Sequence, residues 1–203
     1  MKNKFKLVSI FGIASILLLL AFKPLNEKKV IVIDAGHGGK DFGATVGEVM
    51  EKKIVENLAN KIKALNKDKN IEIVLLREED NFLDLKERVD RINALKPNLV
   101  ISLHVNNTKN EAVNGVEAFV SKENKFQEES YKHAEGLIEK VSNDNLAKRG
   151  VKEAPLFILA NSNCPAVNLQ VGFLSNTKER EYLTSEKGQN EIASNVISYL
   201  KKL

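Results

Sequence analysis

Apolar residues are arranged in two patterns along this chain: short continuous runs, and residues spaced three or four positions apart. Segments of the two kinds alternate. Short, largely apolar runs rich in β-branched residues predict strands that are buried on both faces. Such runs occupy residues 30–33, 71–76, 98–103 and 166–173. Residues 115–121 instead alternate between apolar and polar positions, which predicts a strand with one solvated face. A sixth strand is predicted at residues 156–159.

Between these strands, apolar residues recur three or four positions apart, which predicts helices with one buried face. The predicted helices cover residues 51–66, 85–95, 126–141 and 187–203. The buried face of the second helix is expected to comprise Leu85, Val89, Ile92 and Leu95. Tyr131 is expected to point inward from the third helix. The polar residues that follow this helix, up to Lys152, are expected to form a loop.

Strands that alternate with helices are typical of an α/β domain. We therefore predict a single domain over residues 29–203, with a six-stranded, mixed but largely parallel sheet flanked by helices. The sequence contains no internal repeat and no low-complexity tract. In α/β folds, functional side chains gather at the carboxyl ends of the strands.

Residues 1–28 have the layout of an export signal. Three lysines precede an apolar run of 16 residues, 7–22, which ends at Lys23 and Pro24. This is the arrangement of a secretory signal peptide, and the run falls just short of the roughly 17–25 residues that a spanning helix needs. We expect either a signal peptide or an N-terminal membrane anchor. Either would place the domain outside the cytoplasmic membrane, in the periplasm or cell envelope.

Charge is balanced once this leader is set aside. The formal net charge is +4, but Lys2, Lys4, Lys6 and Lys23 lie before or directly after the apolar run, and without these four lysines 27 basic residues face 27 acidic residues. No basic face is evident, which argues against a nucleic-acid partner. The single cysteine, Cys164, has no partner for an internal disulfide and is expected to be a buried, unreactive thiol. We expect a monomer.

Two of the three histidines directly follow core strands. His37 lies in the glycine-rich turn after residues 30–33, and His104 follows residues 98–103. Zinc in hydrolases commonly binds two histidines and one carboxylate and leaves a fourth position for water. Glu51, at the start of the helix after the first strand, is the natural third ligand. Spacing alone leaves three rival carboxylates open, namely Asp34, Asp41 and Glu48.

Several segments resemble, in order, the motifs of the zinc-dependent N-acetylmuramoyl-L-alanine amidases of bacteria. The matching segments are VIVIDAGHGGKDFGA from Val30, the Glu51–Lys52 pair, the charged run from Arg77 to Arg88, SLHVN around His104, RGVKEA at residues 149–154 and PAVNLQVGFLSN at residues 165–176. Together they cover the whole predicted domain. The resemblance implies one zinc ion held by His37, Glu51 and His104.

The same resemblance implies a hydrolase of peptidoglycan that cleaves the amide bond between N-acetylmuramic acid and L-alanine. Asn106, in the segment around His104, is a candidate substrate-binding residue. A substrate outside the cytoplasmic membrane agrees with the export signal in residues 1–28. A different zinc hydrolase, such as a carboxypeptidase or a deacetylase, would use the same metal on another bond.

One position departs from the pattern of this family. Its last strand usually reads V-E-x-G-F-x-S-N, with the glutamate as catalytic acid/base, and Gln170 occupies that position here. An amide has no carboxylate to take a proton, and general acid–base catalysis contributes roughly 10²–10⁴-fold in rate. Three alternatives follow: a weak amidase, an amidase that uses another carboxylate such as Glu153 or Glu179, or a catalytically silent, zinc-bearing peptidoglycan-binding module.

Overall fold

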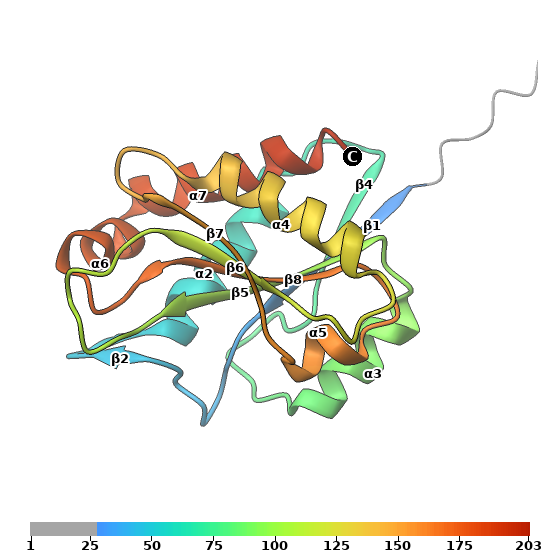
Figure 1. The fold of residues 1–203 in the computed structure, drawn as a ribbon, viewed down its shortest axis with the longest axis horizontal. Helices are drawn as coiled ribbons and strands as arrows, with labels where there is room; N and C mark the ends of the chain where they lie inside the picture. The colour runs from blue at the N-terminus through green and yellow to red at the C-terminus, as the bar shows by residue number, and fades with distance from the viewer. Residues whose placement is uncertain (1–27) are drawn as a thin grey trace, which may run out of the picture.

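A six-stranded sheet lies between two layers of helices (Figure 1). The computed structural model describes residues 28–203, so all of the predicted leader except Lys28 falls outside the described residues. The strand order is β4-β1-β5-β8-β6-β7, and every neighbouring pair is parallel except β8 and β6. The strands are β1 (Lys29–Ala35), β4 (Ile71–Leu75), β5 (Leu99–Asn106), β6 (Val116–Val120), β7 (Lys148–Glu153) and β8 (Ala166–Phe173). The predicted fold class is confirmed.

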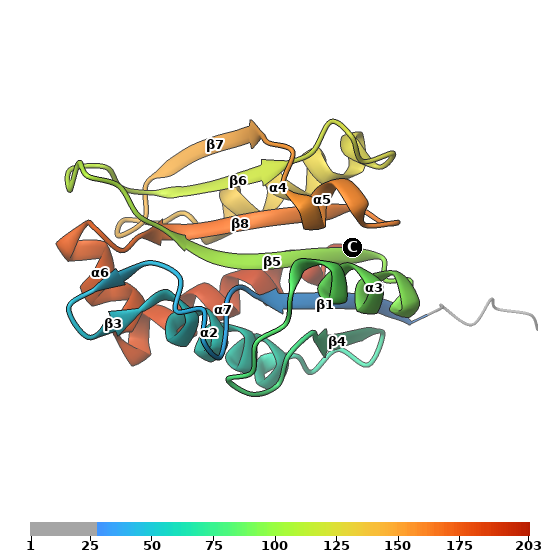
Figure 2. The ribbon, with the colours of Figure 1, turned by 90° about the horizontal axis from the view of Figure 1, so that it is seen from below.

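The two helical layers differ in size (Figures 1 and 2). The larger layer comprises α2 (Glu51–Leu65), α4 (Gln127–Val141) and α7 (Glu186–Leu200). The smaller layer comprises α3 (Leu85–Leu95) and the short α5 (Phe157–Asn161). Two further pieces are α6 (Thr177–Thr184), which follows β8, and a hairpin of β2 (Thr45–Val46) and β3 (Val49–Met50), which leads into α2. Within residues 28–203, no helix has the length and hydropathy needed to cross a membrane.

The smaller layer covers only part of its face of the sheet. Neighbouring residues of a strand point to opposite faces, so Ile31 and Ile33 pack under the larger layer while Val32 packs under the smaller one. The strand residues in this smaller core are Val32, Val100 and Ala166. Two positions further along the same strands, the side chains on this face are Asp34, Ser102 and Asn168. Polar groups therefore gather on this face towards the carboxyl ends of β1, β5 and β8.

One predicted strand was wrong. Residues 156–159 do not extend the sheet: from Phe157 onward they belong to α5, in which only Ile158 and Leu159 are buried. The sixth strand is β7 instead, within the segment predicted to be a loop. β7 has the sequence KRGVKE and lies at the edge of the sheet, where four of its six residues are exposed. An edge strand of this kind needs no apolar run, so the pattern that revealed the central strands is missing.

Helix α3 also buries a different face from the one predicted. Leu85 and Leu95 are 53% and 40% exposed, and the buried side chains are those of Arg88, Val89 and Ile92. Tyr131 on α4, expected to point inward, is 41% exposed. Leu85 and Leu95 are the first and last residues of α3, and Tyr131 lies in the second turn of α4, so their side chains stay partly in contact with solvent. Cys164 is buried as predicted, and burial raises the pKa of its thiol to about 11.

Candidate metal centre

The glycine-rich turn after β1 packs against the end of β5. The Gly36 amide donates to the carbonyl of Leu103 at 3.1 Å. A Cβ atom at Gly36 would lie only 2.3 Å from Cε1 of His104, so this close approach requires glycine. His37, the next residue, has a left-handed backbone conformation with φ of 59°, which is strained for any residue other than glycine. The turn thus carries His37 over the end of the sheet beside His104.

Three side chains from separate elements converge at this point: His37 from the turn, Glu51 from the first position of α2, and His104 from β5. Oε1 of Glu51 lies 3.1 Å from Nε2 of His37 and 2.9 Å from Nδ1 of His104. The two imidazole rings are 5.0 Å apart and nearly perpendicular. One possible ligand atom from each residue lies within 4.8 Å of the other two. The structure therefore brings the three residues together as a His–Glu–His cluster.

Hydrogen bonds from outside the cluster orient its members. Nδ1 of His37 lies 2.9 Å from Oδ2 of Asp41, which leaves Nε2 facing Glu51. Glu51 accepts the amide of Ala44 on Oε2 at 2.8 Å and the amide of Val105 on Oε1 at 3.0 Å. Supporting contacts of this kind fix the direction of metal ligands in proteins.

The three rival carboxylates occupy other places. Asp41 binds the far nitrogen of His37 and is a supporting group. Asp34 is buried and paired with Arg88 and with the hydroxyl of Ser102. Glu48 is exposed in the turn between β2 and β3. Among the described residues, Glu51 is therefore the carboxylate that joins the two histidines.

The charges of the cluster are mutually supportive. Burial alone would lower the pKa of His37, but its hydrogen bonds to Glu51 and Asp41 and their negative charges raise it more, so the pKa lies above its ordinary value. Burial alone would raise the pKa of Glu51, but the hydrogen bonds from His104 and His37 outweigh it and hold the pKa far below the usual range. Glu51 is therefore a carboxylate at neutral pH, ready to bind a cation.

Two buried arginines donate hydrogen bonds to backbone carbonyls of the glycine-rich turn. Arg77 donates to the carbonyls of Ala35 and Gly36, at 3.0 and 3.1 Å. Arg88 donates to the carbonyls of Ala35 and His37 and forms the ion pair with Asp34. Three consecutive carbonyls of the turn are thus satisfied by guanidinium groups. These contacts stabilise the strained backbone of His37 and so fix the position of its ring.

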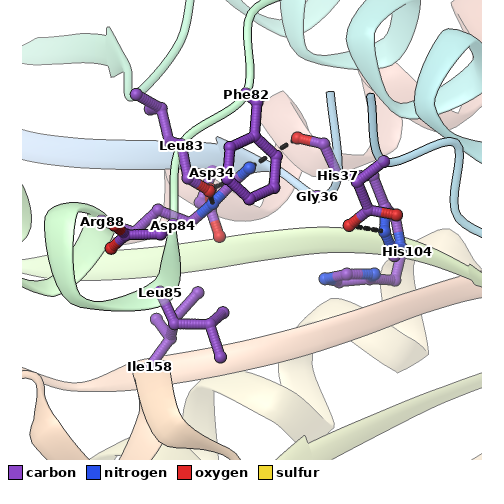
Figure 3. Close-up of a pocket in the computed structure, with 11 residues that line it drawn as sticks. Asp34, Gly36, His37, Phe82, Leu83, Asp84, Leu85, Arg88, His104 and Ile158 are labelled. Atoms are coloured by element: carbon purple, nitrogen blue, oxygen red, sulfur yellow. Dashed lines mark hydrogen bonds and ion pairs between the residues drawn. The ribbon is translucent and has the colours of Figure 1, made fainter. Parts of the chain in front are cut away.

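The donor set of the cluster fits a zinc ion. Two imidazoles and one carboxylate are the ligands of many catalytic zinc sites, which keep one position open. The cluster borders a cavity of about 320 Å³ on the α3 side of the sheet. Its lining includes the apolar side chains of Phe82, Leu85 and Ile158 and the charged side chains of Asp34, Asp84 and Arg88, and His37 and His104 lie close together at one end (Figure 3). A ligand in the cavity would therefore meet the cluster directly.

A row of polar side chains continues from the cluster across the sheet. The strand register pairs His104 with Gln170 and Gln170 with Glu117, so the three lie side by side on one face. Gln170 donates from Nε2 to Oδ1 of Asn168 at 2.8 Å. Its Oε1 atom is buried and has no hydrogen-bond partner within residues 28–203. Gln170 also lines a second cavity of about 310 Å³, which His104 shares with the first.

Comparison with known proteins decides the family. Residues 31–202 match the model of the N-acetylmuramoyl-L-alanine amidase family Amidase_3. The chain belongs to this family. The catalytic domain of the amidase CwlV from Bacillus (Paenibacillus) polymyxa var. colistinus has the same fold, with a TM-score of 0.77 and 34% identity over 86% of this chain and 97% of that one.

Two further relatives extend over most of this amidase. The germination-specific N-acetylmuramoyl-L-alanine amidase of Bacillus subtilis is 27% identical over 97% of this chain and 93% of its own length. The protein YqiI of the same organism is 30% identical over 85% of this chain and 83% of its own length. The likeness therefore covers the whole domain rather than one motif.

The two carboxylates suggested as substitutes for an acid/base lie elsewhere in this amidase. Glu179 is buried and accepts the amides of Gly115 and Phe173, at 2.6 and 2.7 Å. Glu153 ends β7 and forms a partly exposed ion pair with Lys122 at 2.7 Å. Neither residue lines a cavity that His104 borders.

The carboxylate that does lie beside Gln170 is Glu117, which the sequence analysis missed. Its side chain is 1% exposed, and it accepts hydrogen bonds from Asn106 at 2.9 Å, Arg149 at 2.7 Å and Lys152 at 2.8 Å. The signal in the sequence was an acidic residue between apolar residues of a predicted strand. Asn106 thus contacts Glu117, and its role in substrate binding stays a prediction.

Proposed function

We propose that this chain hydrolyses the amide bond between N-acetylmuramic acid and L-alanine in peptidoglycan, and that His37, Glu51 and His104 hold one zinc ion for the reaction. The observation that carries the proposal is the His–Glu–His cluster, whose ligand atoms converge at the edge of an open cavity. Membership of the amidase family supports the choice of the scissile bond. When bound, zinc would activate water and polarise the amide carbonyl.

The residues of the chain contribute position and shape to this reaction. Asp41 holds the His37 ring so that Nε2 faces the cluster, and the Val105 and Ala44 amides hold both oxygens of Glu51. The apolar wall of the cavity excludes water from one side of the substrate, which strengthens the polar contacts on the other side.

Proton transfer is the step that Gln170 limits. The free Oε1 atom can accept a hydrogen bond from a water molecule or from the substrate amide, so Gln170 can orient the reacting groups. It cannot take up and release a proton at neutral pH. We therefore infer slow turnover. The same observation favours a second candidate function, a zinc-bearing module that binds peptidoglycan without cleaving it.

Location follows from the substrate. Peptidoglycan lies outside the cytoplasmic membrane, and the lysines and apolar run of residues 1–28 agree with export as a signal peptide or as an N-terminal anchor. We propose that the domain acts as a monomer in the periplasm or cell envelope. All elements that build the site come from one chain.

The test compares the native protein with the Gln170→Glu variant, each loaded with one equivalent of zinc, by release of stem peptide from purified peptidoglycan. The variant should be about 10²–10⁴-fold faster, the usual contribution of a general acid/base. Asn168→Asp is the matched control, because it adds a carboxylate two positions away on the same strand face, and it should not accelerate cleavage.

Three results would each change the proposal. First, neither the native protein nor the Gln170→Glu variant binds zinc, and neither one binds or cleaves peptidoglycan. The protein then has another function. A native protein as fast as the Gln170→Glu variant has its acid/base elsewhere. A native protein that binds peptidoglycan but cleaves it only after the substitution has the second function.

A further inference from the structure

Glu117 and its two basic neighbours, Arg149 and Lys152, form a group that we call the Glu117 cluster. Burial alone would raise the pKa of Glu117, but hydrogen bonds from Lys152 and Arg149 lower it more, so the carboxylate is ionised at neutral pH. One negative charge then faces two positive charges. The three groups of the cluster together carry one excess positive charge, and the adjacent Gln170 is neutral. Glu179, which also interacts with the charge of Arg149, is buried and bound by the amides of Gly115 and Phe173.

Both cations retain unused hydrogen-bond donors. Arg149 donates from Nε to Glu117 and from Nη1 to the Asn114 carbonyl, and a guanidinium group carries five N–H donors in all. Lys152 donates to Glu117, and its ammonium group has three donors. Their side chains are 34% and 49% exposed. Among the described residues, Glu117 is the one carboxylate within 4 Å of either cation. A second anion can therefore reach them from solvent.

The position of the Glu117 cluster defines which part of a substrate it meets. His104, Gln170 and Glu117 occupy three neighbouring strands in register, β5, β8 and β6, which lie next to one another in Figure 2. Neighbouring strands are about 4.8 Å apart, so Glu117 lies roughly 10 Å across the sheet from His104. An extended peptide advances about 3.3–3.6 Å per residue. Two residues of an extended peptide therefore cover most of the distance from His104 to Glu117, and the long side chains of Arg149 and Lys152 cover the rest. A carboxylate on the second residue after the scissile bond can thus contact these two cations.

The other side of the His–Glu–His cluster does not suit an anionic group. Its lining combines the apolar side chains of Phe82, Leu85 and Ile158 with three carboxylates, those of Asp34, Asp41 and Asp84. The one arginine there, Arg88, is 3% exposed and is occupied by Asp34 and two backbone carbonyls. Uncharged sugar and acyl groups fit this side, so the charged peptide lies towards β6 and β7.

We infer that Arg149 and Lys152 bind a carboxylate on the second residue of the stem peptide and select it over the corresponding carboxamide. This inference rests on the proposed function. Arg149 and Lys152 are then specificity residues: they contact the substrate away from the scissile bond. Glu117 positions both cations and also holds Asn106 on the same face.

The experiment measures binding of two synthetic muramyl dipeptides to the zinc-loaded native protein by calorimetry. The two ligands differ only in carrying a carboxylate or a carboxamide on the second residue. The acid should bind about five- to tenfold more tightly, the effect of one partly screened ionic hydrogen bond. The preference should shrink as ionic strength rises. Arg149→Gln and Lys152→Gln should each reduce the preference, whereas Arg149→Lys, which retains the charge, should keep most of it.

Lys148→Gln is the matched control. Lys148 lies on the same strand, but it pairs with Glu139 of α4 and therefore points to the opposite face. This variant should keep the native preference. If Arg149→Gln fails to fold, the Lys152→Gln variant, whose substituted residue is half-exposed, still tests the inference.

The outcomes separate this inference from the proposed function. Equal binding of the acid and the amide by the native protein overturns the inference and leaves the function intact. A preference that survives both glutamine variants also overturns it, because the selective group then lies elsewhere. Absence of binding for both ligands overturns the inference, and release of stem peptide from purified peptidoglycan then decides separately whether the proposed function stands.

Discussion

Arg88 and Asp34 form an ion pair that is sealed from solvent beneath the glycine-rich turn. Their side chains are 3% and 0% exposed, and Arg88 also donates to the carbonyls of Ala35 and His37. A single side chain of α3 thus connects the end of β1 to the backbone of the first histidine of the His–Glu–His cluster. The packing of α3 and the geometry of the His–Glu–His cluster are physically coupled.

Replacing Arg88 should therefore weaken both stability and metal binding. Arg88→Met leaves Asp34 buried without its cation, a change that costs about 3–5 kcal/mol. Zinc affinity should fall about 10–100-fold, as when a supporting contact of a metal ligand is lost. Urea unfolding of the metal-free protein and zinc competition with a chelator measure the two effects. Lys86→Met, on the exposed side of the same helix, should change stability by about 0.5 kcal/mol or less.

Gly43 should be essential to the site, whereas Gly47 should not. Both glycines have positive φ, 67° and 57°, so alanine strains the backbone at either position by about 1–2 kcal/mol. A Cβ atom at Gly43 would also lie 2.6 Å from Oε2 of Glu51 and 2.6 Å from Cδ2 of His37, whereas one at Gly47 would meet nothing within 4 Å. Gly43→Ala should therefore reduce zinc affinity at least about tenfold. Similar zinc affinity in both variants would mean that the turn adjusts without moving the cluster.

Metal stoichiometry tests the ligand set directly. The native protein should bind one equivalent of zinc, and Glu51→Gln or His104→Ala should abolish tight binding, because three protein ligands are the usual minimum of such a site. His133→Asn is the control. His133 lies on α4, where Nδ1 is 2.7 Å from the Tyr199 hydroxyl. Elemental analysis after dialysis gives the result, and loss of zinc in the His133 variant would place the metal elsewhere.

Acid should destabilise the domain partly through Glu117. Its pKa in the folded protein lies below the ordinary value of 4.5, so the unfolded chain binds the proton more readily. The stability that this carboxylate contributes is complete above that value and is lost as the pH falls through the folded pKa. Glu117→Gln should therefore flatten the decline of Tm between about pH 6 and pH 3. Glu128→Gln, on the exposed side of α4, should retain the native decline, and an unchanged profile in the Glu117 variant would contradict the argument.

The sequence predicted the central strands and the proximity of the two histidines because their signals are local. His104 directly follows an apolar run and His37 lies in the turn after another, and the carboxyl ends of neighbouring parallel strands meet at one edge. The choice of Glu51 among four carboxylates depended on the family resemblance. Spacing along the chain does not reveal that Asp41 turns to the outer nitrogen of His37.

The parts that escaped prediction depend on which strands become neighbours. β7 is polar because it lies at the edge, and its edge position follows from the strand order rather than from its own residues. Glu117 resembles an ordinary surface acid of a half-solvated strand. It is buried because Asn106, Arg149 and Lys152 reach it from β5 and β7. Contacts between such distant segments do not change the spacing of apolar residues, so they cannot be predicted from that spacing.

The strand that carries Gln170 is the last of the sheet to be synthesised, yet it lies between β5 and β6 near the centre. A nascent chain that ends before residue 166 has all the other strands but no means of joining β6 and β7 to the rest of the sheet. Pairings between distant segments form slowly, and unpaired strand edges promote association between chains. The domain therefore completes its sheet only after almost the whole chain has been made. Until then, its unpaired edges must be kept from pairing with those of other copies.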